Sequence, residues 1–176
     1  METTELDGLH KMTKRMLLIM RHAKSDWHQS GVMDHDRGLT KRGKRDALGM
    51  GRLMAGKGSL PEIILCSSAR RARLTAKRFV KASQYDGDVV LLSDLYPPSF
   101  SVLPGALSRL PASVGVAMLV GHNPALEELV CSLTGERVRL TTANIACIEL
   151  DAVSWRDVTG HGQGKLCCVL RPKDVP

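Results

Sequence analysis

The chain has 176 residues, of which 43% are hydrophobic and 24% charged, with a formal net charge of +7 and a pI of about 9.4. This length fits one domain whose core needs no metal or disulfide, and no apolar run approaches the roughly 18 residues that span a membrane. The positive charge favours anionic partners, but with 3% aromatic residues and dispersed basic ones we expect neither nucleic acid nor a membrane among them.

The first segment, METTELDGLHKMTKR, lacks the apolar core of a secretory signal and carries acidic residues that transit peptides avoid. We therefore expect residues 1–15 to form a flexible leader. Residues 16–176 are expected to form a single domain of a cytoplasmic protein.

The five cysteines are odd in number, and no two of them have CxxC spacing. This favours free thiols in a reducing compartment over disulfides or a zinc site. The cysteines in apolar runs are expected to be buried, namely Cys66, Cys147, Cys167 and Cys168.

Short apolar runs alternate with longer amphipathic ones along the rest of the chain. The apolar runs predict strands at residues 16–20, 63–66, 89–92, 116–120, 146–150 and 166–170. Helices are predicted at 40–57, 69–82, within 99–110, and at 124–133, with Thr40 and Pro124 as favourable starting residues. The strands are apolar on both sides, which predicts helices on both faces of the sheet. The alternation indicates a three-layer α/β/α fold around a mostly parallel sheet, to which the last strand pair can add an antiparallel edge.

Polar motifs follow three of these strands at the point where each strand ends. RH at 21–22 follows the first strand, SSARR at 67–71 the second, and GHNP at 121–124 the fourth. The carboxyl ends of parallel strands meet at one edge of a sheet, where open α/β sheets bind ligands, so we expect the motifs to share one crevice. Each motif alone is weak evidence, because a lone histidine is more often structural than catalytic.

Two or more guanidinium groups and two imidazoles in one crevice suit phosphoryl transfer. Arginine pairs bidentately with phosphate oxygens, and helix N-termini after the second and fourth strands would point N–H groups at an anion. One neutral histidine can attack phosphorus, while the other stabilises charge on the phosphoryl oxygens. Such a site requires no metal or other cofactor, because arginines carry the positive charge.

The same motifs resemble those of a known family. LLIMRHAKSDW at 17–27 resembles the RHG/RHA signature of the histidine phosphatase superfamily, and SSARRARLTA at 67–76 and MLVGHNPALEELV at 118–130 resemble its later motifs. DHDRGLTKRGKRDA at 34–47 and LRPKDV at 170–175 resemble the short SixA-type phosphohistidine phosphatase branch. The similarity runs from residue 16 to residue 175 in the right order.

This resemblance implies a phosphoglycerate-mutase-like fold without a large cap insertion, and a hydrolase that works through a phosphohistidine intermediate. It makes His22 the nucleophile and places Arg21, Arg71 and His122 around the phosphoryl group. The serine-plus-four spacing of the second motif selects Arg71 over Arg70, which we expect to be exposed to solvent.

Four further residues are candidates for supporting roles. Arg37 could orient a loop or the substrate, although a loop-bracing salt bridge explains it as well. Lys24 could face the phosphate or solvent, and Asn123 is expected to shape the turn before its helix. Asp94 is the nearest candidate for a general acid, although a loop or capping role is the stronger interpretation.

The lack of a clear general acid bears on the substrate. An alkoxide leaving group needs a proton, whereas imidazole leaves more readily because its conjugate acid has a pKa near 6.5. The expected substrate is therefore phosphohistidine in a protein; the alternatives are a small phosphate ester, such as a sugar phosphate or nucleotide, and a non-catalytic phosphoprotein-binding module. A metal site is the weaker interpretation, against a solvated loop, of the cluster His28, Asp34, His35 and Asp36.

Overall fold

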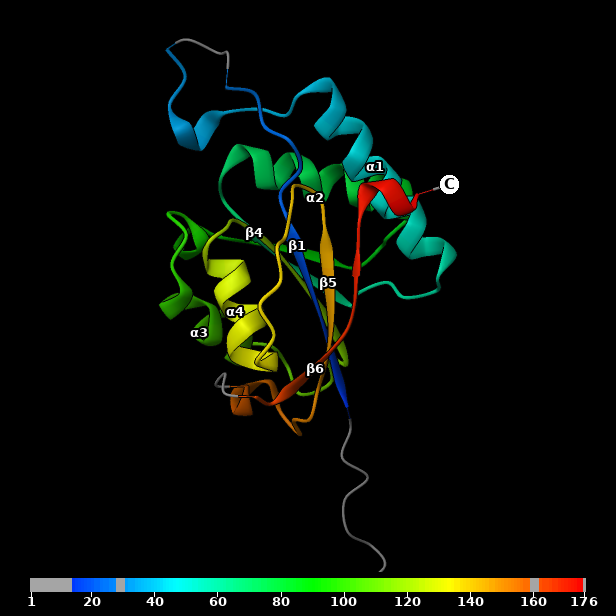
Figure 1. The fold of residues 1–176 in the computed structure, drawn as a ribbon, viewed down its shortest axis with the longest axis vertical. Coiled ribbons are helices and arrows are strands. Elements are labelled where there is room, and N and C mark those ends of the chain that lie inside the picture. The colour runs from blue at the N-terminus through cyan, green and yellow to red at the C-terminus, as the bar shows by residue number, and fades with distance from the viewer. Residues whose placement is uncertain (1–13, 28–30, 159–161, 176) are drawn as a thin grey trace, which may run out of the picture.

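The computed structural model describes residues 14–27, 31–158 and 162–175. In these ranges the strands are β1 (Arg15–Arg21), β2 (Ile63–Ser67), β3 (Asp88–Leu92), β4 (Val116–Gly121), β5 (Ile145–Leu150) and β6 (Gly164–Leu170). The α-helices are α1 (Lys41–Gly56), α2 (Arg70–Ser83), α3 (Leu103–Ser108) and α4 (Ala125–Thr134), shown in Figure 1. Short 3-10 helices include η1 (Asp34–Asp36), η2 (Ser93–Leu95), η3 (Phe100–Val102), η4 (Trp155–Asp157) and η5 (Pro172–Asp174). None of the helices in the described ranges combines the length and the apolarity needed to cross a bilayer.

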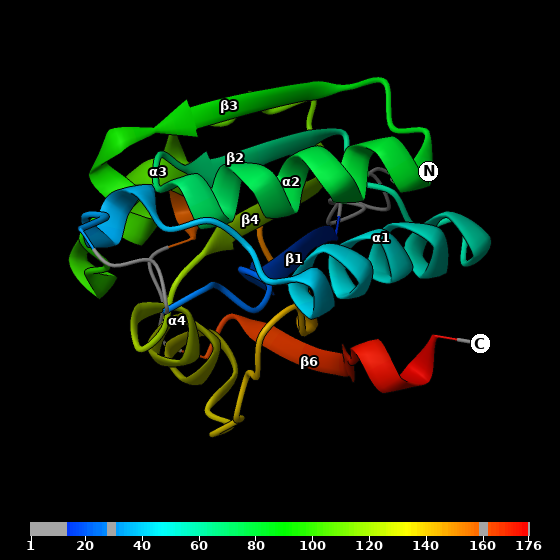
Figure 2. The same cartoon turned by 90° about the horizontal axis from the view of Figure 1, so that it is seen from above.

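The six strands form one sheet in the order β3-β2-β4-β1-β5-β6, which Figure 2 shows from β3 at the upper edge to β6 at the lower edge. The pairs β2–β3, β2–β4 and β1–β4 are parallel, whereas β5 runs antiparallel to both β1 and β6. The predicted α/β class, the mostly parallel sheet and the antiparallel edge are therefore confirmed.

Alternate residues of the central strand β1 enter two different cores. Leu17 and Ile19 pack with apolar residues of α3 and α4. Leu18 and Met20 pack with apolar residues of α1 and α2 on the opposite face of the sheet. This alternation follows from the two-residue period of a strand and confirms the three predicted layers.

Two glycines let α1 approach its neighbours closely. A Cβ atom at Gly51 would lie 2.5 Å from the carbonyl oxygen of Phe79, so the residue permits tight packing of α1 on α2. A Cβ atom at Gly43 would lie 2.2 Å from the carbonyl oxygen of Lys24. Thr40 caps α1 by accepting a hydrogen bond from the Gly43 N–H. The first turn of α1 is thus fixed against the loop that follows β1.

The prediction that helices cover both faces of every strand is wrong at the two edges of the sheet. In β3 the side chains of Val89, Val90 and Leu91 are exposed, and in β6 so are Cys167 and Cys168. The four helices cover the four central strands, whereas the edge strands β3 and β6 are only partly covered. The buried positions predicted for Cys167 and Cys168 are therefore wrong, whereas Cys66 and Cys147 are buried as predicted.

The element boundaries differ from the predictions in two places. The helix predicted within 99–110 is divided into η3 and the short α3, a region that contains Pro104 and Gly105. Arg15, which we placed in the leader, is the first residue of β1, and its guanidinium donates to backbone carbonyls including that of Ala112. The rest of the predicted leader, residues 1–13, lies outside the described residues.

Candidate active site

The carboxyl ends of three adjacent strands bring the predicted motifs together. β2, β4 and β1 are neighbours in the sheet, and they end at Ser67, Gly121 and Arg21. The imidazole rings of His22 and His122 lie 5.0 Å apart between centroids, inclined at 52°. Both side chains are buried, so the crevice places two imidazoles in an environment of low polarity.

His22 is held in one orientation by the backbone. Its Nδ1 lies 2.8 Å from the carbonyl oxygen of Ala23, so Nδ1 carries the proton and donates it, which leaves the lone pair on Nε2. The pKa of His22 is lowered to about 4, mainly by burial. The hydrogen bond to Ala23 opposes this shift, whereas the charges of Arg71 and Arg21 add to it. At neutral pH the ring is therefore uncharged, with Nε2 available as a nucleophile.

Thr75 links this loop to α2. The N–H of Ala23 donates to Thr75 Oγ1 at 3.0 Å, and the Thr75 hydroxyl donates to the carbonyl oxygen of Arg71 at 2.7 Å. Both Ala23 and Thr75 are fully buried. The loop that carries His22 and the helical turn that carries Arg71 are thus joined through one side chain.

His122 is oriented by Ser67. The Nε2 atom of His122 lies 2.8 Å from Ser67 Oγ, which also accepts a hydrogen bond from the Ala69 N–H at 3.3 Å. We assign the Ser67 hydroxyl proton to the bond with Nε2, which puts the ring proton of His122 on Nδ1. That atom is buried and has no partner among the described residues. The pKa of His122 is lowered to about 3, mainly by burial, and the charges of His22 and Arg71 contribute to this shift.

Two arginines flank the imidazoles, and both have unused donors. Arg21 donates to the carbonyl oxygen of Leu140 at 2.7 Å, and Arg71 donates to the carbonyl oxygen of Asp34 at 2.7 Å. The Nε atom of each guanidinium is buried without a hydrogen-bond partner in the described structure. Together with Nδ1 of His122 this makes three buried donors without acceptors, an arrangement that suits an anion.

Asp34, Tyr96 and His35 form a rim beside Arg71. Asp34 forms an ion pair with Arg71 at 3.1 Å and accepts a hydrogen bond from the Tyr96 hydroxyl at 2.7 Å. The ring of Tyr96 lies 5.8 Å from that of His122 and 5.0 Å from that of His35. Partial burial opposes ionisation of Asp34, but hydrogen bonds from Tyr96 and Arg37 and the charge of Arg71 outweigh it and lower its pKa to about 2. The hydrogen bond to Asp34 in turn raises the pKa of Tyr96.

Arg37 braces the loop after β1. It forms an ion pair with Asp34 at 2.6 Å and donates to Ser25 Oγ at 2.9 Å. The exposed ring of Trp27 stacks on its guanidinium, with 3.5 Å between Cζ and the ring centroid. These contacts match the loop-bracing interpretation of Arg37, and they give Trp27 a structural role that the sequence did not reveal.

The contacts of the remaining predicted residues are with groups other than the two imidazoles. Lys24 is exposed, whereas Asn123 donates to Glu127 and to the carbonyl oxygen of Leu140, which shapes the turn before α4. Asp94 is 61% exposed and approaches Arg109 at 4.0 Å. Arg70 is exposed, as predicted from the spacing.

No group of three or more histidine, cysteine or acidic side chains is placed to hold a metal ion within the described ranges. Of the cluster considered above, His28 lies outside those ranges. Asp34 pairs with Arg37 and Arg71, and His35 contacts Ser68 Oγ at 3.2 Å.

Sequence reasoning missed three contributors to the site: the ion pairs of Asp34, the ring of Tyr96, and the buried hydroxyl of Thr75. Tyr96 follows β3 after η2, so the rule that selects residues after parallel strands could have found it. Asp34 lies three residues before Arg37, which is a signal for a local ion pair. Thr75 belongs to the SSARRARLTA stretch quoted above, but that stretch does not reveal its partner Ala23, which is distant in sequence.

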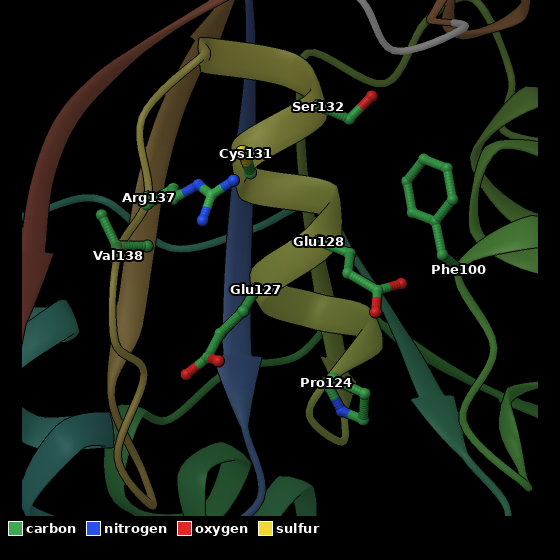
Figure 3. A pocket seen from close by; sticks show the side chains of 8 residues that line it. All are labelled: Phe100, Pro124, Glu127, Glu128, Cys131, Ser132, Arg137 and Val138. Atoms are coloured by element: carbon green, nitrogen blue, oxygen red, sulfur yellow. The ribbon is translucent and has the colours of Figure 1, made fainter.

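A cavity lies along α4, and neither imidazole lines it. It has a volume of about 540 Å³, and Figure 3 shows its lining residues: Phe100, Pro124, Glu127, Glu128, Cys131, Ser132, Arg137 and Val138. Glu127 is already engaged, because its Oε1 accepts hydrogen bonds from the Asn123 side chain and the Leu140 N–H. The cavity contains none of the four residues predicted to handle phosphate.

Residues 17–97 match the family model of the histidine phosphatase superfamily, branch 1. An uncharacterised chloroplastic protein of Arabidopsis thaliana is 31% identical over 172 residues, which cover 90% of this chain and 78% of that protein. An uncharacterised protein of Mycobacterium tuberculosis is 34% identical over 153 residues, which cover 79% of this chain and 91% of that protein.

Solved structures share the fold over nearly the whole chain. A protein of Agrobacterium tumefaciens described as a phosphohistidine phosphatase SixA is 26% identical, with a TM-score of 0.77 over 90% of this chain and 98% of that one. A protein of Nakamurella multipartitia with the same description is 28% identical, with a TM-score of 0.73 over 90% and 96%. A protein of Escherichia coli described as an alpha-ribazole-5'-P phosphatase is 18% identical, with a TM-score of 0.64 over 92% and 99%, and shows the likeness of fold alone. These matches confirm the predicted phosphoglycerate-mutase-like architecture.

Proposed function

The chain belongs to the histidine phosphatase superfamily, in its SixA-type branch, and on that premise we propose that it removes phosphate from phosphohistidine in a protein by way of a phosphorylated His22. The observation that carries the proposal is the state of His22. Its Nδ1 is bound to the Ala23 carbonyl and its pKa is lowered to about 4, so Nε2 is a free, uncharged nucleophile. The proposal includes a reaction that needs no metal.

In the first step Nε2 of His22 attacks phosphorus. The Nε2–P bond forms, the bond from phosphorus to the substrate imidazole breaks, and its electron pair passes to the substrate nitrogen. Arg21, Arg71 and Nδ1–H of His122 donate hydrogen bonds to the phosphoryl oxygens, as their three buried unpartnered donors suggest, and the two guanidinium groups balance the negative charge. In the second step the oxygen of a water molecule forms a bond to phosphorus and releases its proton to solvent. The Nε2–P bond breaks, and its electron pair returns to Nε2 of His22 as phosphate leaves.

The leaving group is the basis of the substrate assignment. Asp34 is ionised because its pKa lies at about 2, so it has no proton to donate at neutral pH. Asp94 is largely exposed and lies beside Arg109. An alkoxide needs a donated proton to leave, whereas a substrate imidazole that takes a proton from solvent leaves as a neutral ring with a conjugate-acid pKa of about 6.5.

A substrate panel tests this proposal. It contains a phosphohistidine peptide, p-nitrophenyl phosphate and glucose 6-phosphate, each with and without EDTA. We expect kcat/KM for the peptide to exceed that for the sugar phosphate by about 100-fold or more, the range that a missing general acid accounts for, with no effect of EDTA. Faster turnover of the sugar phosphate would establish a small-molecule phosphatase, for which the shared fold of the E. coli protein is a precedent.

The variant Asp94→Asn sharpens the same test. If Asp94 donates no proton, the variant changes kcat/KM for all three substrates by less than about twofold, the usual effect of an exposed surface substitution. A selective loss on glucose 6-phosphate would identify Asp94 as a general acid and contradict the argument from the leaving group.

A further inference from the structure

The edge strand β3 presents an unprotected apolar surface. It pairs with β2 along one side only, in the described part of the chain. Val89, Val90 and Leu91 are 39%, 38% and 54% exposed, and between Asp88 and Leu92 the strand carries no charge, proline or bulge. Natural edge strands normally carry such features because a bare edge offers its unpaired N–H and C=O groups to another chain. β3 therefore has the features of a strand that accepts a partner.

Basic residues of α2 border this edge. A groove of about 340 Å³ lies between the helix and the strand, and it is lined by Arg73, Ala76, Lys77, Val80, Val89 and Leu91. The helix RRARLTAKRFVKAS contains six basic residues and no acidic one. The groove thus places two cations beside the α2 face of the edge, while Val90 is exposed on the opposite face. This is complementary to a strand that alternates acidic and apolar side chains.

The same wall argues against a second copy of this chain as the occupant. Antiparallel pairing of β3 with β3 about a two-fold axis would place both α2 helices on the same face of the extended sheet. The basic wall of one copy, including Lys77, would then face that of the other without any acidic residue of α2 to balance it. Like charges in such positions are destabilising, so an acidic partner is favoured.

The carboxyl end of β3 lies at the same edge of the sheet as the proposed phosphoryl site. Leu92 at the carboxyl end of β3 is paired in register with Ser67, whose hydroxyl contacts His122. Since β2 and β4 lie between β3 and β1, a strand added outside β3 would lie four strand spacings, about 19 Å, from β1. About six residues of extended chain span that distance. A phosphohistidine about six residues beyond the added strand can thus reach His22.

We propose that β3 binds an extended segment of the phosphorylated substrate protein as an additional strand, with acidic side chains beside Arg73 and Lys77 on the α2 face and apolar ones beside Val90 on the opposite face. This inference rests on the proposed function, since it names the part of the substrate that the enzyme recognises. Main-chain hydrogen bonds to the edge supply affinity, and the cationic wall selects the acidic sequence.

Synthetic phosphohistidine peptides test the proposal. Each contains about six residues of alternating valine and either glutamate or lysine, a typical strand length, joined through glycines to a histidine that is phosphorylated chemically with phosphoramidate. The histidine is placed at either end, so that both strand directions are sampled. We expect kcat/KM for the Val–Glu peptide to exceed that for the Val–Lys peptide about tenfold, from two surface charge pairs gained in one and two repulsions in the other.

Variants locate the effect. The double variant Arg73→Glu/Lys77→Glu should invert the ratio of the two kcat/KM values, and Val90→Lys should lower the value for the Val–Glu peptide. The matched control is Val153→Lys, because Val153 is 49% exposed and lies outside the sheet; it should preserve the wild-type ratio. Equal values for the two peptides, or a ratio that survives charge reversal, would overturn the proposal.

Two further outcomes are separable from these. If neither peptide is hydrolysed, the proposed function fails, but fluorescence anisotropy with labelled, unphosphorylated peptides still tests binding at the β3 edge. Preferential binding of the Val–Glu peptide that is lost in the double variant supports the β3 proposal. Equal binding of the two peptides overturns the β3 proposal. Sedimentation velocity gives the remaining outcome. A wild-type dimer that dissociates in Val90→Lys would make a second copy the occupant and refute the acidic segment.

Discussion

The two imidazoles and the rim around Arg71 differ in nearly every physical property. His22 and His122 are buried and uncharged, and each is oriented by one hydrogen bond, between His22 Nδ1 and the Ala23 carbonyl and between His122 Nε2 and the Ser67 hydroxyl. At the rim, Asp34 is half exposed, ionised, and shared between two arginines and Tyr96. Burial controls ionisation in the first region, and partners control it in the second.

The difference separates two tasks. In the proposed mechanism the buried imidazoles provide a nucleophile and a hydrogen-bond donor, both uncharged at neutral pH. The rim would then limit which leaving groups are tolerated, because its carboxylate has already lost its proton. The proposal thus assigns phosphoryl chemistry and substrate choice to different residues, and each can be perturbed separately.

Replacing the nucleophile should have the largest effect. His22→Ala removes Nε2, and we expect kcat on a phosphohistidine peptide to fall by on the order of 10⁴-fold or more, as for other catalytic nucleophiles. The matched substitution at the rim, His35→Ala, should cost far less, because His35 contacts Ser68 and Tyr96 and not the phosphoryl group in this account. Similar losses in the two variants would erase the distinction between the regions.

Removing the guanidinium of Arg71 should come next. Arg71→Ala deletes a donor to the phosphoryl oxygens, and a loss of about 10²- to 10³-fold in kcat is expected for a group of this kind. Arg70→Ala is the control in the same helical turn, since Arg70 is exposed. Steady-state kinetics on p-nitrophenyl phosphate measure both, and a large loss in Arg70→Ala would show that the serine-plus-four assignment is mistaken.

Acid titration should separate the two regions by pH. The folded pKa values of His22 and His122, about 4 and about 3, lie below their ordinary value of 6.5. The unfolded chain therefore binds more protons, and the stability due to the neutral imidazoles is complete above pH 6.5. It is lost as pH falls toward 4 for His22 and toward 3 for His122. Asp34, at about 2 against its ordinary 3.8, contributes stability that is complete above pH 3.8 and is lost as pH falls toward 2.

Calorimetric melting at a series of pH values tests this separation. Between pH 6.5 and 4 the Tm of the wild type should decline, and His122→Gln should flatten that decline while Asp34→Asn leaves its slope unchanged. An unchanged slope in His122→Gln would mean that the imidazole is not held neutral by burial.

A smaller effect is expected from the hydroxyl that orients His122. Ser67→Ala removes one hydrogen bond worth about 1 kcal/mol, which corresponds to about a fivefold loss in kcat/KM. Ser68→Ala, in which the lost partner is His35 at the rim, should change kcat/KM by less than this. A greater loss in Ser68→Ala than in Ser67→Ala would reverse the roles of the two serines.

The sheet and the convergence of Arg21, His22 and His122 could be predicted because each depends on short-range patterns and on the rule for parallel strand ends. The rim could not, because the contacts of Asp34 with Arg71 and Tyr96 join three segments distant in sequence. The exposure of Cys168 was mispredicted for a related reason. An apolar strand sequence does not show whether the strand lies at the centre or the edge of a sheet, since that depends on the order of all six strands.

The most direct test of the account is the position of phosphate on the enzyme. The hydrogen bond from Nδ1 of His22 to the Ala23 carbonyl leaves only Nε2 free to attack. After rapid quenching in alkali during turnover of a phosphohistidine peptide, ³¹P–¹H correlation NMR and peptide mapping should find an acid-labile phosphate on Nε2 of His22. Phosphate on Nδ1, on another residue, or on no residue at all under these conditions would contradict the account.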